Sequence, residues 1–135
     1  MKMKSLMETM MRKSPKRIAD EIEQSEREFY QKQRATWSRL VPEIAFVLLK
    51  CNARRLRAEI IEIAEEAFAT YPDDFWVWHG ERRVPDHGLV LLTLDEAKKR
   101  EWGYVAGDWF RGWRLTQKGL AFAKDVERRK GDRRR

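Results

Sequence analysis

Residues 93–126 of the 135-residue chain read TLDEAKKREWGYVAGDWFRGWRLTQKGLAFAKDV, and this stretch decides the expected fold. Thr93 and Glu96 have the spacing of a capping box, in which each side chain bonds to the backbone N–H group of the other residue. That spacing predicts a helix over residues 94–102. Gly103 follows it, and glycine is the residue that most often ends a helix. The stretch therefore begins with a short, capped helix.

A β-hairpin and a second helix come next. Residues 104–105 begin a strand, and the glycines within 106–112 are typical of a connection between antiparallel strands. Residues 113–116 alternate as a returning strand. Thr116 is then suited to cap a last helix over about 117–129, whose apolar residues keep helical spacing.

The order of helix, Gly103-Tyr-Val105 strand, glycine turn and Trp113-Arg-Leu-Thr-Gln-Lys-Gly119 resembles the C-terminal half of a winged helix-turn-helix domain. The MarR-like and PadR-like bacterial regulators are the families to which residues 93–126 are similar. The resemblance implies a mainly α fold with a small β-hairpin wing and an N-terminal helical extension. It also implies a double-stranded DNA partner, because in these families the helix before the wing enters the major groove.

The resemblance further implies which residues contact DNA. The groove helix 94–102 and the wing 104–115 carry the expected contacts, which are Lys98, Lys99, Arg100, Trp109, Arg111 and Arg114. Guanidinium groups suit guanine and phosphate contacts, and a narrow minor groove attracts arginine. Three acidic residues share the predicted helix with three basic ones, so its net charge is zero. An ordinary surface helix or a protein-contact helix is therefore the alternative.

The residues before this stretch predict further helices. Ser14-Pro15 is typical of a helix start, and a sparse apolar stripe follows that fits a helix lying on a partner or on its own domain. Pro42 predicts a helix boundary near Val41. Two helices are expected after it, over residues 43–51 and 53–70.

Three arginines lie in the first turns of the predicted helix 53–70, where the helix dipole disfavours positive charge. They are Arg54, Arg55 and Arg57. Either the two helices are continuous, or the arginines contact a ligand such as nucleic acid. Arginines on a simple solvated face are the alternative interpretation.

Residues 71–92 follow no clear period. We expect an irregular connection or a short strand around 75–78, and the apolar run 89–92 is too short to be assigned by its spacing. The turn of a helix-turn-helix is usually only a few residues long. The resemblance therefore implies either an insertion here or a different identity for helix 53–70.

Basic charge is concentrated at the two ends of the chain. The net charge is +7, whereas residues 1–17 and 128–135 each carry +5, so the middle is acidic by 3. The last residues of the chain are Arg133, Arg134 and Arg135. Tails of this kind contact phosphates without reading sequence, and binding of RNA is an alternative to binding of DNA.

The composition also indicates in which cellular compartment the protein is expected. Cys51 is the only cysteine, which excludes an intramolecular disulfide and a cysteine-based zinc finger. The N-terminus lacks the apolar core of a signal peptide, and no run approaches the roughly 20 apolar residues of a membrane span. We therefore expect a cytoplasmic protein that has no membrane partner and needs no cofactor.

Two patterns point weakly towards an enzyme. The histidines and acids of residues 72–87 match no common metal-ligand spacing. Pro85-Asp86 followed by Glu96-Ala-Lys98 has the spacing of the Pro-Asp…Glu-x-Lys motif of metal-dependent nucleases. In that motif the carboxylates bind Mg²⁺ and the lysine positions the attacking water. That motif needs Glu and Lys on a strand, whereas here they lie in a predicted helix. We predict a protein without a metal site and without catalysis, and a nuclease remains a minor alternative.

The sequence thus predicts a basic tail and an oligomerisation helix over 1–41, a winged-helix domain over 42–127 and a basic tail over 128–135. The expected function is transcriptional regulation or DNA gripping within a larger assembly, by a homodimer or a protein complex. The alternative is a protein-interaction adaptor. An adaptor would show an apolar, Trp-lined patch where a regulator has a basic surface.

Overall fold

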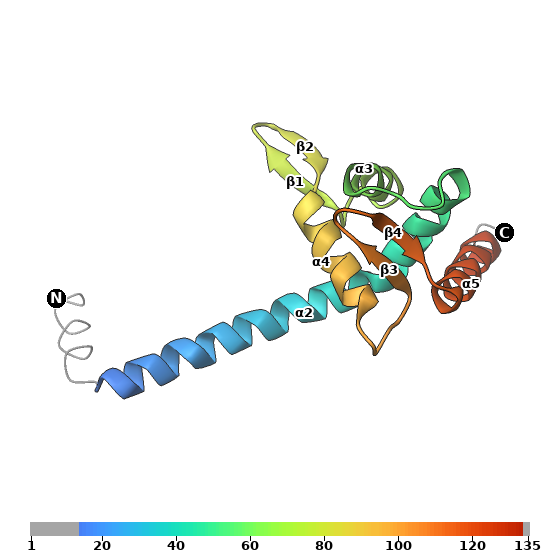
Figure 1. Ribbon diagram of the computed structural model, residues 1–135. Helices are drawn as coiled ribbons and strands as arrows, with labels where there is room; N and C mark the ends of the chain where they lie inside the picture. The colour runs from blue at the N-terminus through green and yellow to red at the C-terminus, as the bar shows by residue number, and fades with distance from the viewer. Residues whose placement is uncertain (1–13, 134–135) are drawn as a thin grey trace. The chain divides into compact units, whose positions relative to one another are not determined.

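The computed structural model describes residues 14–133, and it is mainly helical with two small antiparallel hairpins (Figure 1). The elements in chain order are α2 (Pro15–Arg54), α3 (Ile60–Thr70), β1 (Trp76–His79), β2 (Arg82–Pro85), α4 (His87–Lys98), β3 (Val105–Asp108), β4 (Gly112–Leu115) and α5 (Gln117–Arg133). The chain divides into one unit up to Ala35 and a second unit over Thr36–Arg135. No helix among residues 14–133 is long and apolar enough to cross a membrane.

The described part of the first unit is the beginning of α2. Ser14 caps the helix as predicted, because its Oγ accepts the N–H of Arg17 at 3.2 Å. Arg27 and Glu23 form an ion pair at 2.7 Å, one helical turn apart. Ile22 and Phe29 are 54% and 65% exposed. Among residues 14–35, Ile22 and Phe29 therefore form an exposed apolar stripe.

The predicted helix boundary at Pro42 is wrong, because α2 continues through this residue to Arg54. A proline inside a helix removes one hydrogen bond and costs about 3 kcal/mol. Leu40, Val41 and Ile44 are at most 1% exposed around it. Burying such side chains contributes roughly 1.5–3 kcal/mol each, which offsets the defect.

The predicted helix 53–70 is also wrong in its first third. Helix α3 begins only at Ile60, and residues 55–59 form a non-helical connection that bends at residues 56–57. Ala58 pairs with Trp113 in an antiparallel bridge, with N–H to carbonyl bonds of 2.9 and 2.8 Å in the two directions. Leu56 lies in this connection and is 80% exposed.

Residues 71–92 contain an ordered hairpin and the start of a helix, and the short strand expected around 75–78 is present as β1. Strands β1 and β2 form a hairpin, and Gly80 in its turn has a φ of 64°, which favours glycine. The apolar run 89–92 belongs to α4. This helix starts after Asp86, whose carboxylate accepts the N–H of Leu89 at 3.0 Å.

The capping box at Thr93 is therefore wrong. Thr93 is buried inside α4, where its hydroxyl donates to the carbonyl of Leu89 at 2.7 Å. The predicted helix 94–102 is replaced by one that ends at Lys98, and Lys99 and Arg100 lie in the turn that follows. A Thr-x-x-Glu spacing inside a helix is indistinguishable from one at its start when the true cap lies seven residues earlier.

The hairpin and the last helix lie where the sequence predicts them. Strands β3 and β4 pair from Val105 with Leu115 to Asp108 with Gly112. Thr116 caps α5, because its Oγ accepts the N–H of Gly119 at 3.0 Å. The backbone of Gly119 lies directly against the carbonyl of Tyr104, where a Cβ atom has no room.

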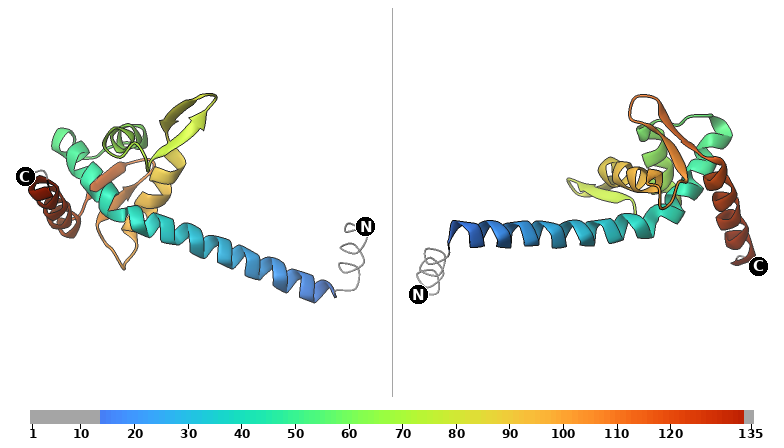
Figure 2. Two further views of the ribbon diagram at one scale, coloured as in Figure 1. Left: turned by 180° about the vertical axis from the view of Figure 1, so that it is seen from behind. Right: turned by 60° about the horizontal axis from the view of Figure 1, so that its bottom comes forward.

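One core holds the second unit together. Helices α3 and α4 and the β3–β4 hairpin pack against the C-terminal part of α2, and α5 lies beside its end (Figures 1 and 2). Trp113 is the largest buried side chain at 1% exposure, and Phe75, Leu94 and Ile63 are fully buried with it.

We predict that Gly119→Ala lowers the free energy of unfolding by about 1–3 kcal/mol, because its Cβ collides with the Tyr104 carbonyl. Gly88→Ala is the matched control, since its Cβ meets only the Asp86 carboxylate at 3.5 Å. That change in the first turn of α4 is expected to be neutral or stabilising by up to about 1 kcal/mol. Urea unfolding of both variants checks this, and equal losses would contradict it.

Candidate functional site

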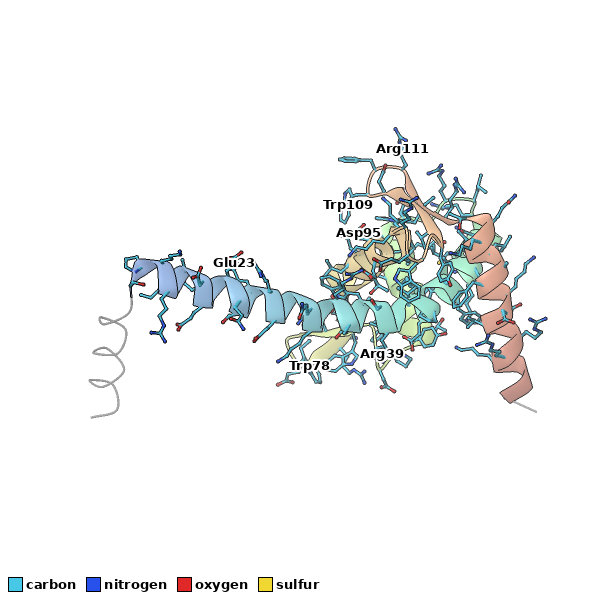
Figure 3. The ribbon with its side chains drawn as sticks, turned by 90° about the horizontal axis from the view of Figure 1, so that it is seen from below. Glu23, Arg39, Trp78, Asp95, Trp109 and Arg111 are labelled. Atoms are coloured by element: carbon cyan, nitrogen blue, oxygen red, sulfur yellow. The ribbon has the colours of Figure 1, made fainter. Side chains whose placement is uncertain are left out.

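The turn between β3 and β4 is a defined structure with exposed side chains. The Asp108 carboxylate accepts the N–H of Phe110 at 3.0 Å and that of Arg111 at 2.8 Å. Such an Asx turn holds the backbone in place. Trp109 and Phe110 are nevertheless 57% and 94% exposed, and the Arg111 side chain is 79% exposed. Figure 3 shows Trp109 and Arg111 extending outward from this end of the hairpin.

The positive charges of Arg111 and Lys98 act on Asp108 in the turn. The N–H group of Arg111 lowers the pKa of Asp108, with further lowering from the N–H group of Phe110 and from the charges of Arg111 and Lys98. Asp108 is therefore ionised near neutral pH, and its negative charge is already shared among these donors. Lys98, at the end of α4, is thus one of the charges that act on Asp108 in the turn.

Arg57 joins this surface from a distant part of the sequence. The Ala58–Trp113 bridge lays residues 55–59 along β4, and the Arg57 side chain lies against Gly112. Arg57 is exposed. We define the hairpin surface as Arg57, Lys98, Trp109, Phe110 and Arg111.

Other predicted site residues lie near this surface without a described role in it. Arg55 is exposed in the same connection as Arg57, and Arg100 is exposed in the turn after α4. Lys99 instead pairs with the buried Glu96 carboxylate, at 2.8 Å. The side chain of Arg133, and all of Arg134 and Arg135, lie outside the described residues, as does the N-terminal tail up to residue 13.

Arg54 and Arg114 are directed elsewhere. Arg54 lies in the last turn of α2, where the helix dipole favours it, and pairs with Glu66 at 3.6 Å. The conflict with the dipole expected from the sequence therefore does not exist. Arg114 is half-buried and lines a groove of about 320 Å³ with mostly apolar neighbours, among them Leu56 and Leu120.

The exposed face of α4 is not basic. It presents His87, Leu92, Asp95 and Lys98, and Leu92 is 41% exposed. Asp95 lies on the same side of the second unit as Trp109 and Arg111 (Figure 3). Of the three basic residues predicted for this helix, only Lys98 is within it.

Glu96 is a structural carboxylate. It is fully buried, and burial alone would raise its pKa, yet contacts with Lys99, Trp102 and Ser38 bring the pKa below its ordinary value. The indole N–H of Trp102 donates to it at 3.3 Å and the hydroxyl of Ser38 at 3.2 Å. Asp86 and Glu96 stand ten residues apart along one helix, which is about 15 Å. They therefore cannot share one metal ion as the nuclease string requires.

No cluster of three or more His, Cys, Asp or Glu side chains in the described part of the chain is arranged to hold a metal ion. The acids and histidines of 72–87 are separated between the β1–β2 hairpin and the start of α4.

A second polar cluster lies between α2, α5 and the loop after α3. The pKa of Glu43 is raised to about 8, first by burial and then by the neighbouring Asp74, against the lowering effect of the Arg39 and Lys130 charges. Burial also raises the pKa of Tyr71, to about 12. The Lys130 ammonium lies over the Tyr71 ring at 4.1 Å. Glu43 is therefore protonated at neutral pH in the folded chain.

Sequence reasoning missed two features of the hairpin surface. Phe110 is the most exposed large apolar side chain among the described residues. The sequence pattern assigns it only to the turn between two strands. An aromatic pair at the centre of a glycine-flanked turn was a usable signal. The proximity of Arg57 to the turn had no sequence signal, because it depends on a bridge across 55 residues.

The β1–β2 hairpin carries a separate exposed surface. Trp78 and Val77 are 60% and 44% exposed, and Arg83 stacks on Trp76 with 4.3 Å between guanidinium and ring centre. Trp78 and Arg111 lie on opposite sides of the second unit in Figure 3.

Comparison with protein-family models, with characterised proteins and with solved structures gives no match to this chain. The site therefore has to be interpreted from its own geometry.

We predict that the protein loses about 1.4 kcal/mol of stability between pH 7 and pH 9 through Glu43. The folded pKa, about 8, lies above the ordinary 4.5, so the folded chain holds the extra proton and stability falls as pH rises through this window. Thermal melting of Glu43→Gln over this range should be nearly flat. Glu65→Gln, on the exposed face of α3, is the control and should keep the wild-type slope. A wild-type slope in Glu43→Gln would contradict the assignment.

Proposed function

We propose that this chain is a non-catalytic DNA-binding protein built on a winged-helix module, and that it holds duplex DNA through the hairpin surface. The order of α2, the Ala58 bridge, α3, α4 and the β3–β4 hairpin supports the module, because a winged helix has three helices and a hairpin with a short first strand. In this interpretation the β1–β2 hairpin is an insertion in the turn between the second and third helices.

The proposal is carried by the turn that holds Arg111, because the Cβ of Arg57 lies beside Gly112 and the charge of Lys98 acts on Asp108. These three basic residues come from three separate segments, and the only carboxylate within the turn, Asp108, already accepts two backbone N–H groups. Arg111 also pairs with Asp108 at 3.9 Å, and Arg57 and Lys98 add two further positive charges. A surface with this net positive charge suits the phosphates of a nucleic-acid backbone.

The exposed face of α4 favours backbone contacts over reading of bases. A groove-reading helix needs donors and acceptors for base edges, whereas α4 offers Leu92 and Asp95 at its centre. Asp95 would also repel the phosphates on either side of the major groove. We therefore propose that the hairpin and the 55–57 segment grip the duplex with little sequence preference.

The test is fluorescence-anisotropy binding to a random duplex across a salt series. Arg57→Ala with Arg111→Ala is expected to weaken binding at least tenfold and to make the salt slope shallower by about 0.9 per lost phosphate contact. Arg39→Ala with Arg82→Ala removes the same charge from exposed sites outside the hairpin surface and is the control. Absence of wild-type binding at low salt, or equal losses in both double variants, would defeat the proposal.

The first unit suits self-association of such a protein. Ile22 and Phe29 form an exposed stripe on a helix whose charges pair within the helix, as Arg27 does with Glu23. Two copies would present two hairpin surfaces to one duplex. We predict that Ile22→Ser with Phe29→Ser shifts the sedimentation coefficient from dimer to monomer, whereas Glu26→Ser with Glu28→Ser does not. A monomeric wild type would contradict this.

The adaptor function is the second candidate. The exposed Trp109, Phe110 and Leu92 are apolar side chains of the kind expected of an adaptor on the wing and on α4. The exposed Trp78 and Val77 of the β1–β2 hairpin favour it as well. A protein partner on that side would leave DNA binding by the hairpin surface intact. The adaptor function replaces DNA binding if Trp78→Ala impairs the protein's function in the cell and the Arg57 and Arg111 changes do not.

A further inference from the structure

We infer that Phe110, assisted by Trp109, is an aromatic wedge that stacks on bases at an opened or unpaired step of the DNA. This inference rests on the proposed DNA binding and adds to it a preferred substrate, namely duplex with unstacked bases.

The position of the wedge is defined by the backbone. Asp108 holds the N–H groups of both Phe110 and Arg111, and Gly112 closes the turn with a φ of 83°. Phe110 is thus 94% exposed on a fixed turn at the end of a hairpin that is anchored by the buried Trp113. A wedge needs such rigidity, because a ring on a loose loop would lose ordering entropy on insertion.

The surroundings of the ring select the chemistry of the partner. Arg111 adjoins Phe110 in sequence, while Lys98 and Arg57 approach the turn from α4 and from the 55–59 segment. Cations around two flat rings match a ligand with both phosphates and flat π faces, and bases stack on aromatic side chains irrespective of sequence. Two rings offer little apolar area for stable attachment to a membrane surface.

The inference explains why exposed aromatics and a non-basic α4 occur together. A protein that does not read base edges can still select DNA by how easily it deforms, and apolar wedges use this by unstacking a base step. Unstacking costs least where a base is already mismatched or single-stranded. The preferred substrate is therefore a bubble or a mismatch rather than a perfect duplex.

The experiment measures the ratio of affinities for two DNAs of the same length, one perfectly paired and one with a central three-base bubble. We expect wild type to bind the bubble about tenfold more tightly, a ratio within the range of base stacking on one aromatic ring. Phe110→Ala should reduce the ratio to about one. Phe110→Trp should retain the preference, and Phe110→Leu should lose most of it.

Trp78→Ala is the matched control, because it removes an exposed aromatic from the β1–β2 hairpin. 2-Aminopurine placed in the bubble reports stacking directly, and its emission on binding should differ between wild type and Phe110→Ala. A ratio near one in wild type, or a ratio that Phe110→Ala leaves unchanged, overturns the wedge and leaves the proposed function standing. Failure of wild type to bind either DNA overturns both. Phe110-dependent binding to phosphatidylserine vesicles, with no effect on DNA, assigns the ring to a membrane surface instead and also overturns the wedge.

Discussion

The antiparallel bridge between Ala58 and Trp113 is the contact on which the rest of the second unit depends. Its two backbone hydrogen bonds tie the connection between α2 and α3 to the strand β4, 55 residues later. Asn52 reinforces the junction, because its side-chain oxygen accepts the N–H of Leu115 at 3.0 Å. Trp113 is held by this pairing in the centre of the core. The loop-closure entropy lost in forming the bridge is compensated by the burial of that indole and of the residues around it.

The bridge also determines where charge collects. It interrupts what would otherwise continue as a helix after Arg54, and it turns Arg57 towards the β3–β4 hairpin. Arg54, three residues earlier, is left at the end of α2 and pairs with Glu66. Neighbouring arginines of one short run thus have different roles, one in internal pairing and one on an exposed surface. The hairpin surface is a consequence of backbone pairing and not of a basic sequence motif.

Two buried carboxyl groups show how polar residues are accommodated in the same unit. Glu96 is stabilised in its charged form by Lys99, Trp102 and Ser38, and it thereby links α2, α4 and the turn after α4. Glu43 has no such set of donors, so burial and Asp74 raise its pKa to about 8. A buried carboxyl group therefore remains ionised where donors converge on it and takes up a proton where they do not.

The sequence by itself determined the local elements whose signals lie within a few residues. Thr116 and the Ser14-Pro15 pair cap helices as their spacing indicates, and the glycine-flanked turn of 106–112 lies in a hairpin. Those signals are short-range hydrogen bonds and backbone preferences, which need no partner from a distant part of the chain. Only the tertiary structure decided that α2 continues through Pro42, that α4 starts at His87 and that Arg57 lies beside Gly112. Each of these depends on burial or pairing between segments far apart in the chain, and neither periodicity nor capping spacing carries that information.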